Sequence, residues 1–399
     1  MAFDPQAFRA DFPYFQQPDA VTYLDSAATA LKPHALLQAT MAFYQSAGSV
    51  HRSQYDEKQT ALFEQARERV KTFIHAKEKE SIIWTSGTTQ AINLVASGLA
   101  HKLKATSEII ISEADHHANF VTWSEIARQY GAKLHILPIN DQWLIEEQTL
   151  IDTLNENTLL VALNAVSNVT GTAQPIKRLI THIRQHSHAW VLVDAAQAIS
   201  HTAMDLQALD ADFLAFSAHK LYGPNGLGVL SGKRHALEQL QPALYGGKMV
   251  AHVSAQQIRF ADLPYRLEAG TPNIAGVIGF NAVLGWLEQW DLEAAEKHAV
   301  ALAQQCQARL ATYPNCQLFR SPQPSSVVCF VFNGIATSDL ATLLAEQHIA
   351  LRAGEHCAQP YLARLGQRST LRLSFAPYNQ QEDVDTFFHA LDKALALLD

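Results

Sequence analysis

Lys220 is the residue whose position in the sequence most directly suggests chemistry. It follows an apolar run, residues 213–216, that predicts a buried strand, and it precedes a Gly-Pro-Asn-Gly turn. Burial lowers the pKa of a lysine and leaves a nucleophilic amine that can form an imine with a carbonyl. The alternative is a lysine that extends from the strand end into solvent. The residues that follow the other predicted strands distinguish a reactive lysine from one that only reaches solvent.

Polar side chains of complementary types follow the other predicted strands. They are Thr88 and Thr89, His116, Asn168, Asp194 and Gln197 and, beside the lysine, Ser217 and His219. Apolar strands that alternate with helical segments predict a mainly parallel sheet covered on both faces. Ligands of such sheets bind outside the carboxyl ends of the strands. Five polar strand ends therefore favour a shared site over an isolated lysine.

These groups together describe a site for pyridoxal 5′-phosphate (PLP). Asp194 follows a fully apolar strand, so its carboxylate needs a cationic partner, and a pyridinium N–H fits. Gln197 and Asn168 can donate to a phenolate oxygen, and His116 offers a flat face for stacking on the ring. Lys220 can hold the aldehyde. The remaining groups can bind a phosphate near a helix N-terminus: Thr88, Thr89, Ser217 and His219.

Cys357 has the sequence context of an accessible thiol. It lies in a polar loop, residues 352–360, punctuated by Gly and Pro. No two of the four cysteines have CxxC spacing, so no metal site is predicted. Glu355 would raise the pKa of the thiol if its carboxylate lies close, whereas His356 could offset this. The net effect on the thiol stays open.

The composition indicates a globular protein and excludes several partners. The chain has 399 residues, of which 48% are hydrophobic and 17% charged, and a net charge of -8. We expect neither nucleic acid nor a membrane surface as a partner. No apolar run approaches the ~20 residues of a membrane span. The first residues lack the basic and apolar regions of a signal peptide, so a cytoplasmic location is predicted.

The order of the predicted elements gives the domain organisation. Strands and helices alternate up to about residue 230, and a loop-rich segment, 231–275, precedes two long helical stretches. The last hundred residues predict a small α+β domain. We expect residues 1–20 to pack with that small domain, residues 21–285 to form a large PLP-binding domain, and residues 286–399 to form the small domain that carries Cys357.

Short motifs in order along nearly the whole chain resemble cysteine desulfurases of the SufS/CsdA type. This selenocysteine-lyase-like group belongs to the class V aminotransferases, which are PLP enzymes of fold type I. The motifs are YLDSAATALKP (23–33), VHR (50–52), GTT (87–89), HHAN (116–119), SNVTG (167–171), VDAAQ (193–197), SAHKLYGP (217–224), EAGTPN (268–273) and RAGEHCAQP (352–360). The last points to the CsdA-like end of the group. The resemblance implies an α/β fold with a mostly parallel seven-stranded sheet and a smaller C-terminal α+β domain.

The resemblance also implies a role for each matching residue. Lys220 corresponds to the lysine that holds PLP and moves protons, and His116 to the histidine that stacks on the ring. Asp194 and Gln197 match the residues that bind the ring nitrogen and the phenolic oxygen. The phosphate ligands would be Thr88, Thr89, Ser217 and His219. Thr271 matches a threonine that reaches the phosphate of the other subunit's cofactor, which implies a homodimer.

Further matches concern the substrate. Arg372, with help from Asn168, corresponds to the arginine that clamps the substrate carboxylate. The remaining matching substrate positions are Arg352, His51 and Ala28. Cys357 matches the nucleophile that takes sulfur from L-cysteine as a persulfide and leaves alanine. Asp115 and Gln90 stand where the group often has Glu.

The short Cys357 loop runs straight into Pro360, which in the resembling group goes with dependence on a sulfur-acceptor protein of the SufE/CsdE type. Selenocysteine and cysteine sulfinate are further candidate substrates, and iron–sulfur clusters and RNA thiolation are candidate destinations of the sulfur. Two alternatives stay open. One is another class V activity, kynureninase-like or aminotransferase-like, that needs no cysteine at 357. The other is a non-catalytic PLP fold within a sulfur-transfer assembly.

Overall fold

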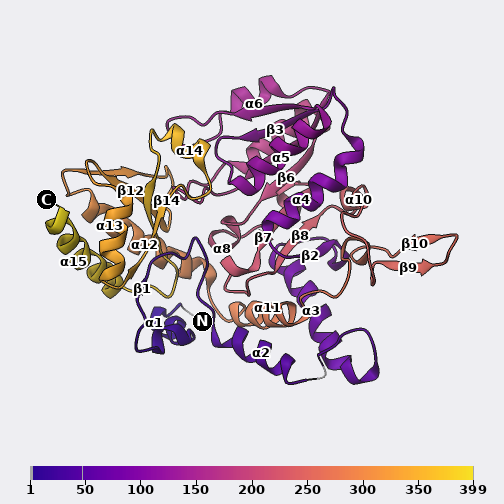
Figure 1. The fold of residues 1–399 in the computed structure, drawn as a ribbon, viewed down its shortest axis with the longest axis horizontal. Helices are drawn as coiled ribbons and strands as arrows, with labels where there is room; N and C mark the ends of the chain where they lie inside the picture. Colours follow the sequence, from indigo (N-terminus) through magenta and orange to yellow (C-terminus); the bar gives the residue numbers. More distant parts are fainter. Residues whose placement is uncertain (1–2, 47, 399) are drawn as a thin grey trace.

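The computed structural model describes residues 3–46 and 48–398 and contains two main sheets of different size (Figure 1). The larger sheet has seven strands in the order β2-β8-β7-β6-β5-β3-β4. Their bounds are β2 Ile82–Thr85, β3 Glu108–Ser112, β4 Lys133–Leu137, β5 Thr158–Asn164, β6 Trp190–Asp194, β7 Phe213–Ser217 and β8 Gly228–Gly232. The strands from β7 to β4 in this order pair in parallel, whereas β8 is antiparallel to both of its neighbours. The predicted fold class is therefore confirmed.

The smaller sheet is antiparallel, with the order β11-β12-β15-β14. Its strands are β11 Cys316–Phe319, β12 Val327–Phe332, β14 Arg352–Gly354 and β15 Thr370–Ser374. Two short ribbons complete the strands: β1 Thr22–Tyr23 pairs with β13 Ile349–Ala350, and β9 Val250–Val253 pairs with β10 Ile258–Phe260. Figure 1 shows β9 and β10 projecting away from the body of the molecule.

Helices cover both faces of the large sheet and one part of the small one (Figure 1). They are α1 Pro5–Ala10, α2 His34–Tyr44, α3 Glu57–Phe73, α4 Thr88–Leu99, α5 His117–Tyr130, α6 Glu147–Thr153, α7 Ile176–His186, α8 Ala198–His201, α9 Leu206–Leu209, α10 Arg234–Glu238, α11 Ile274–Leu287, α12 Leu292–Leu310, α13 Thr337–Glu346, α14 Gln359–Arg364 and α15 Gln381–Leu398. Among the described residues, no helix combines the length and the apolar character that a membrane span needs.

Side-chain alternation along the buried strands fills a core on each face of the large sheet. Val161 and Leu163 of β5 join the core beneath α3, α7 and α11, whereas Leu160 and Ala162 join the core beneath α4 and α5. A third core lies between the small sheet and helices α12, α13 and α15. Continuous apolar strands are the pattern expected of a sheet buried on both faces.

Three elements differ from the sequence-based expectation. β11 and the β9–β10 hairpin lie in segments where no strand was predicted, and β10 is exposed along its whole length, so it carries no core pattern. The strand expected over 349–352 is split between β13 and β14 because its halves pair with different partners. The domain boundary between residues 285 and 286 stays a prediction.

The N-terminal segment contacts both parts of the molecule. The ring of Phe12 lies 4.9 Å from that of Tyr378 and 5.6 Å from that of Trp286. Arg9 forms a salt bridge of 2.9 Å with Asp383. Residues near the start of the chain therefore contact both α11, which packs on the large sheet, and α15, which packs on the small one.

Candidate active site

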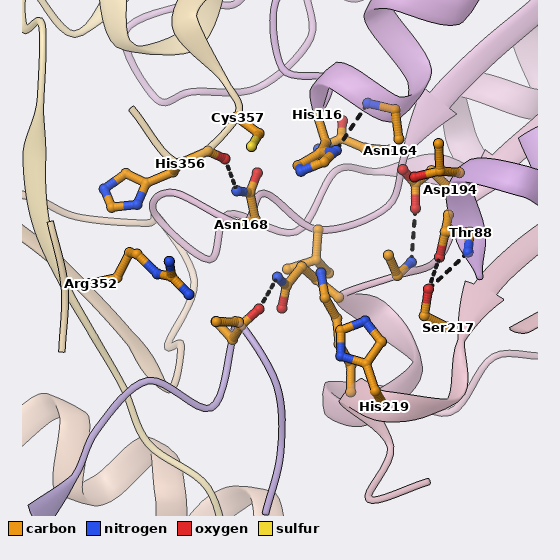
Figure 2. Close-up of a pocket in the computed structure, with 18 of the residues that line it drawn as sticks. Thr88, His116, Asn164, Asn168, Asp194, Ser217, His219, Arg352, His356 and Cys357 are labelled. Atoms are coloured by element: carbon orange, nitrogen blue, oxygen red, sulfur yellow. Dashed lines mark hydrogen bonds between the residues drawn. The ribbon is translucent and has the colours of Figure 1, made fainter. Parts of the chain in front are cut away.

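A cavity of about 410 Å³ lies at the carboxyl ends of the parallel strands, where the Cys357 loop meets the large sheet. All but two of the predicted site residues line it: Ala28, Thr88, Thr89, His116, Asn168, Asp194, Gln197, Ser217, His219, Lys220, Arg352, Cys357 and Arg372. Figure 2 shows Cys357 and His116 facing the same open space, with Arg352 and His356 on one side and Thr88 and Ser217 on the other. The topology thus brings together residues from both sheets.

Lys220 ends the short 3₁₀ turn that follows β7. Burial lowers the pKa of its amine to about 8, and the positive charge of Arg372 acts in the same direction. The negative charge of Asp194 opposes the shift. Near neutral pH this amine therefore has a much larger uncharged fraction than an ordinary lysine, and the uncharged form is the one that attacks an aldehyde.

Asp194 is the last residue of β6 and is only 4% exposed. Its Oδ1 accepts a 2.9 Å hydrogen bond from the N–H of Ala196, and burial raises the pKa of the carboxyl group. Within residues 3–46 and 48–398, no salt bridge reaches this carboxylate. A buried acid of this kind needs a cationic partner from a ligand, and a pyridinium N–H supplies one.

The start of α4, where a phosphate was predicted to bind, forms part of the cavity wall. Ser217 Oγ accepts a hydrogen bond of 2.8 Å from the N–H of Thr88 and lies 2.8 Å from Thr88 Oγ1. Gly228, opposite Ser217 in the sheet, has no room for a side chain, since an added Cβ would lie 2.4 Å from Gly87 Cα. This close approach leaves the N-terminus of α4 facing the cavity, where an anion is favoured.

His116 caps the N-terminus of α5, and its Nδ1 accepts a 3.0 Å hydrogen bond from the N–H of Ala118. Burial and the charge of Lys220 lower the pKa of the imidazole to about 4. The ring is therefore neutral at physiological pH and carries its hydrogen on Nε2. A neutral, fixed ring suits stacking against a planar cofactor.

Two arginines, both predicted to bind the substrate, line the cavity on the side of the small sheet. Arg372 is 3% exposed and donates from Nη1 to the backbone oxygen of Asn168 at 2.8 Å. Its Nη2 donates to Asp25 Oδ1 at 2.8 Å, and Arg352 lies 3.1 Å from the other oxygen of Asp25. Gln197 Nε2 donates to the oxygen of Ala27 at 2.9 Å. The carboxylate of Asp25 thus holds both arginine side chains, and the backbone of Asn168 holds Arg372 as well.

The Cys357 loop is held in an uncommon backbone conformation. His356 and Cys357 have φ of 52° and 53°, in the left-handed region that residues other than glycine rarely adopt. Asn168 donates to the oxygen of His356 at 2.7 Å, and the N–H of His117 donates to the oxygen of Cys357 at 2.8 Å. These contacts fix the loop over the cavity while the Cys357 residue stays exposed.

The carboxylate of Glu355, which raised a question for the thiol, accepts a 2.6 Å hydrogen bond from Gln359. His356 is neutral near pH 7, because burial and Arg372 lower the pKa of its ring to about 3. His356 therefore carries no positive charge with which to offset the carboxylate of Glu355.

His51 and Thr271 do not line the cavity of their own chain. His51 Nε2 lies 3.1 Å from Glu64, and its ring contacts that of Tyr265 edge-on. The resemblance assigns Thr271 to the other subunit's cofactor, so a single chain leaves its role as a prediction. The predicted role of His51 at the substrate also stays a prediction.

Sequence reasoning assigned no role to three residues that lie behind the cavity wall without lining it. Asp25 belongs to the motif at 23–33 but was given no role, because its arginine partners lie far away in the chain. Gly228 carries no functional group. Asp115 is fully buried, and its two oxygens accept from the N–H groups of Ser112 and Asn164, which ties the ends of β3 and β5 together. Burial raises the pKa of the Asp115 carboxyl group to about 7.

Comparison with known proteins identifies the family. The family described as "Aminotransferase class-V" matches residues 22–387. The chain belongs to the aminotransferase class V family. It is 81% identical over 399 residues to a probable cysteine desulfurase of Pasteurella multocida, in an alignment that covers 100% of this chain and 95% of the relative. It is 50% identical to the cysteine desulfurase CsdA of Escherichia coli, over 99% of both chains.

The structural comparison agrees with the family assignment. A crystal structure of Escherichia coli CsdA in its S-sulfonic acid form matches with a TM-score of 0.94 and 49% identity, over 100% of both chains. The predicted resemblance to CsdA-type cysteine desulfurases is confirmed, and the family identifies PLP as the cofactor. The buried Lys220, the Asp194 carboxylate that needs a cation and the open N-terminus of α4 fit this cofactor.

Proposed function

We propose that this enzyme removes sulfur from L-cysteine, leaving L-alanine and a persulfide on Cys357. The observation that carries the proposal is that Cys357 and Lys220, from opposite parts of the fold, line one cavity. The names of the relatives, which are cysteine desulfurases, support the same reaction. The wider use of selenocysteine and cysteine sulfinate is proposed on the family resemblance alone.

PLP, when bound, withdraws electrons from the α-carbon of the substrate. The residues of the chain supply the rest. The amine of Lys220, with its lowered pKa, accepts the Cα proton. Arg372 and Arg352 hold the substrate carboxylate, and Asp194 keeps a positive charge on the ring nitrogen. The neutral ring of His116 stacks on the cofactor and keeps the reacting plane in place.

Sulfur transfer follows from the position of the thiol. The thiolate of Cys357 attacks the substrate sulfur, so that an S–S bond forms while the bond between sulfur and the β-carbon breaks. The electron pair of the broken bond stays with the carbon fragment, which takes up protons and leaves as alanine. No external oxidant or reductant is needed, because the carbon fragment gains the electron pair that the two sulfur atoms lose.

The experiment measures alanine release from L-cysteine together with the intact mass of the protein. The wild type should form alanine and gain the mass of one sulfur atom. Cys357→Ala should do neither while it retains PLP absorbance. Cys316→Ala is the matched control, since Cys316 lies on β11 outside the cavity. Desulfuration that survives in Cys357→Ala would contradict the persulfide mechanism, whereas a wild type that releases no alanine but retains PLP would favour the alternative class V activity.

A colourless wild-type protein that releases no alanine would instead favour the non-catalytic alternative. Absorbance of bound PLP that disappears in Lys220→Ala separates an enzyme from such a scaffold. The two alternatives from the sequence therefore give different results in the same preparation.

We also propose a homodimer and a SufE/CsdE-type protein as sulfur acceptor, in a cytoplasmic enzyme. The exposed Cys357 supports transfer to a second protein. Turnover with L-cysteine should rise when the acceptor is added, and equal rates with and without it would contradict this. For the dimer, sedimentation gives the mass in solution, and Thr271→Ala should weaken PLP retention if that residue reaches the partner's cofactor.

A further inference from the structure

Two positively charged side chains lie next to each other on one face of the small sheet. Arg352 of β14 and Arg372 of β15 are direct partners in the antiparallel register, so their side chains leave the same face of the sheet. Arg372 is buried, whereas the side chain of Arg352 is 50% exposed. Direct opposition of two cations is unfavourable unless an anion lies between them.

Asp25 supplies that anion. Its Oδ1 lies 2.8 Å from Nη2 of Arg372 and its Oδ2 lies 3.1 Å from Nη2 of Arg352. The Asp25 side chain is only 12% exposed, so a single carboxylate with one oxygen on each guanidinium group bridges the pair. The three side chains together keep one net positive charge, which suits one substrate carboxylate.

The main chain around Asp25 fixes this carboxylate. The N–H of Ser374 donates to the oxygen of Leu24 at 2.8 Å, and the N–H of Ala27 donates to Ser374 Oγ at 2.8 Å. The oxygen of Ala27 accepts from Gln197, which follows β6 of the large sheet, at 2.9 Å. Asp25 is therefore held between the end of β15 and the predicted cofactor-binding residues.

Arg372 also retains an unused donor. Its Nε is buried and has no hydrogen-bond partner among the residues that the structure describes. Arg372 lines the cavity, as does Arg352. Buried donors are normally paired, so Arg372 keeps spare hydrogen-bonding capacity beside the cavity that it lines.

We propose that Asp25 is a positioning residue for the substrate: it holds the guanidinium groups of Arg352 and Arg372 side by side, so that both bind the substrate α-carboxylate. This rests on the proposed desulfuration. Asp25 does not touch the reacting atoms. Its main effect is on Arg352, because the burial of Arg372 and its bond to Asn168 hold that side chain independently.

The test is the variant Asp25→Asn. The amide oxygen of the new side chain still accepts from Arg372, whereas its NH₂ group faces Arg352 and releases that exposed side chain. We expect the KM for L-cysteine to rise about tenfold while kcat changes less than about threefold, the pattern of lost ground-state binding. The affinity for the product L-alanine, followed by the absorbance of bound PLP, should fall by a similar factor.

A double-mutant cycle checks the route of the effect. In an Arg352→Gln background, Asp25→Asn should raise the KM by less than about twofold, because the two residues act as a unit. Additive effects in the double mutant would overturn the proposal. If Asp25→Asn does not fold, Asp25→Glu moves the carboxylate by one methylene group and should give the same KM pattern.

Asp212→Asn is the matched control. Asp212 is also a buried aspartate between two cations, 2.7 Å from Arg184 and 3.3 Å from Lys233, and it lies outside the cavity. It should lose thermal stability without a change in KM. If Asp25→Asn behaves like Asp212→Asn, Asp25 is purely structural and the proposal fails. If the wild type releases no alanine from cysteine, the proposed function fails instead.

Discussion

The backbone oxygen of Cys357 accepts a 2.8 Å hydrogen bond from the backbone N–H of His117, the residue that follows His116. The loop that carries the thiol is therefore attached to the first residue of α5, the helix that His116 caps. Because the contact uses main-chain atoms, it does not depend on the side chain of residue 117. It holds the loop that carries the thiol at the edge of the cavity.

The ring of His356 supplies a further attachment of this loop, in addition to the two hydrogen bonds that its main-chain oxygens accept. Its Nε2 lies 2.9 Å from Thr370 Oγ1, and the left-handed conformation of His356 and Cys357 needs such support. We expect His356→Ala to retain bound PLP but to form persulfide about tenfold more slowly, which corresponds to ~1.4 kcal/mol of lost positioning. Single-turnover persulfide formation, followed by mass, measures this.

His117→Ala is the matched control for that prediction. It keeps the main-chain bond to Cys357, and its ring makes a long 3.4 Å hydrogen bond with the N–H of Gln359 and a tilted contact with the ring of His116 at 6.3 Å between centroids. Persulfide formation in His117→Ala should stay within about threefold of the wild type. Equal loss in both variants would mean that the His356 ring has no special part in holding the loop.

The lowered pKa of Lys220 makes a prediction about pH. Burial disfavours the charged amine, so the uncharged form appears as the pH rises through about 8 instead of through the ordinary 10.5. The rate at which the protein freed of cofactor attaches PLP should therefore rise with pH between about 7 and 9 and then level off. The absorbance of attached PLP gives this rate.

A second lysine makes a control necessary. Burial also lowers the pKa of Lys32 to about 8, and its Nζ donates to the oxygen of His219 at 3.0 Å. Lys220→Ala should attach no PLP at any pH, which excludes Lys32 as the source. A wild-type profile that keeps rising toward about pH 10 would contradict the lowered pKa of Lys220.

Asp194 provides a prediction that separates binding from chemistry. Its buried carboxylate can keep a ring nitrogen protonated, which an amide cannot do, so Asp194→Asn should slow alanine release at least ~10²-fold. The loss should appear mainly in kcat. Asp115→Asn, at a buried carboxylate outside the cavity, should lower thermal stability more than it lowers kcat. A normal kcat in Asp194→Asn would exclude this role.

The sequence allowed the large sheet and most of the site to be predicted, for a physical reason. The parallel strands are buried on both faces and so appear as continuous apolar runs, and the residue after such a run marks the edge where ligands bind. Lys220, Asp194 and His116 were found in this way. The motifs extended the prediction to Arg372 and Cys357, which no local pattern could connect to the sheet.

What could not be predicted depends on long-range geometry. The pairing of Arg352 with Arg372 is a matter of register, and the position of Asp25 between them follows from a crossing of distant segments. The left-handed backbone at His356 and Cys357 leaves no trace in residue type, since neither residue is a glycine. The β9–β10 hairpin buries too little to produce a pattern.

The last prediction concerns Gly228, whose contribution to the structure is the absence of a side chain. A Cβ at this position would lie 2.4 Å from Gly87 Cα, a main-chain atom that cannot rotate away as a side chain could. Gly228→Ala should therefore push β8 from the loop before α4 and cost about 1–3 kcal/mol of stability. Because that loop leads into the predicted phosphate-binding end of the cavity, PLP retention after gel filtration should fall as well.

The matched control is Gly247→Ala, where an added Cβ meets nothing within 4 Å and the backbone is not left-handed. Its PLP retention and melting temperature should stay close to those of the wild type. If Gly228→Ala retains PLP as firmly as Gly247→Ala does, the close approach of the two chain segments does not shape the phosphate end. A loss of melting temperature without a loss of PLP would limit the role of Gly228 to packing within the sheet.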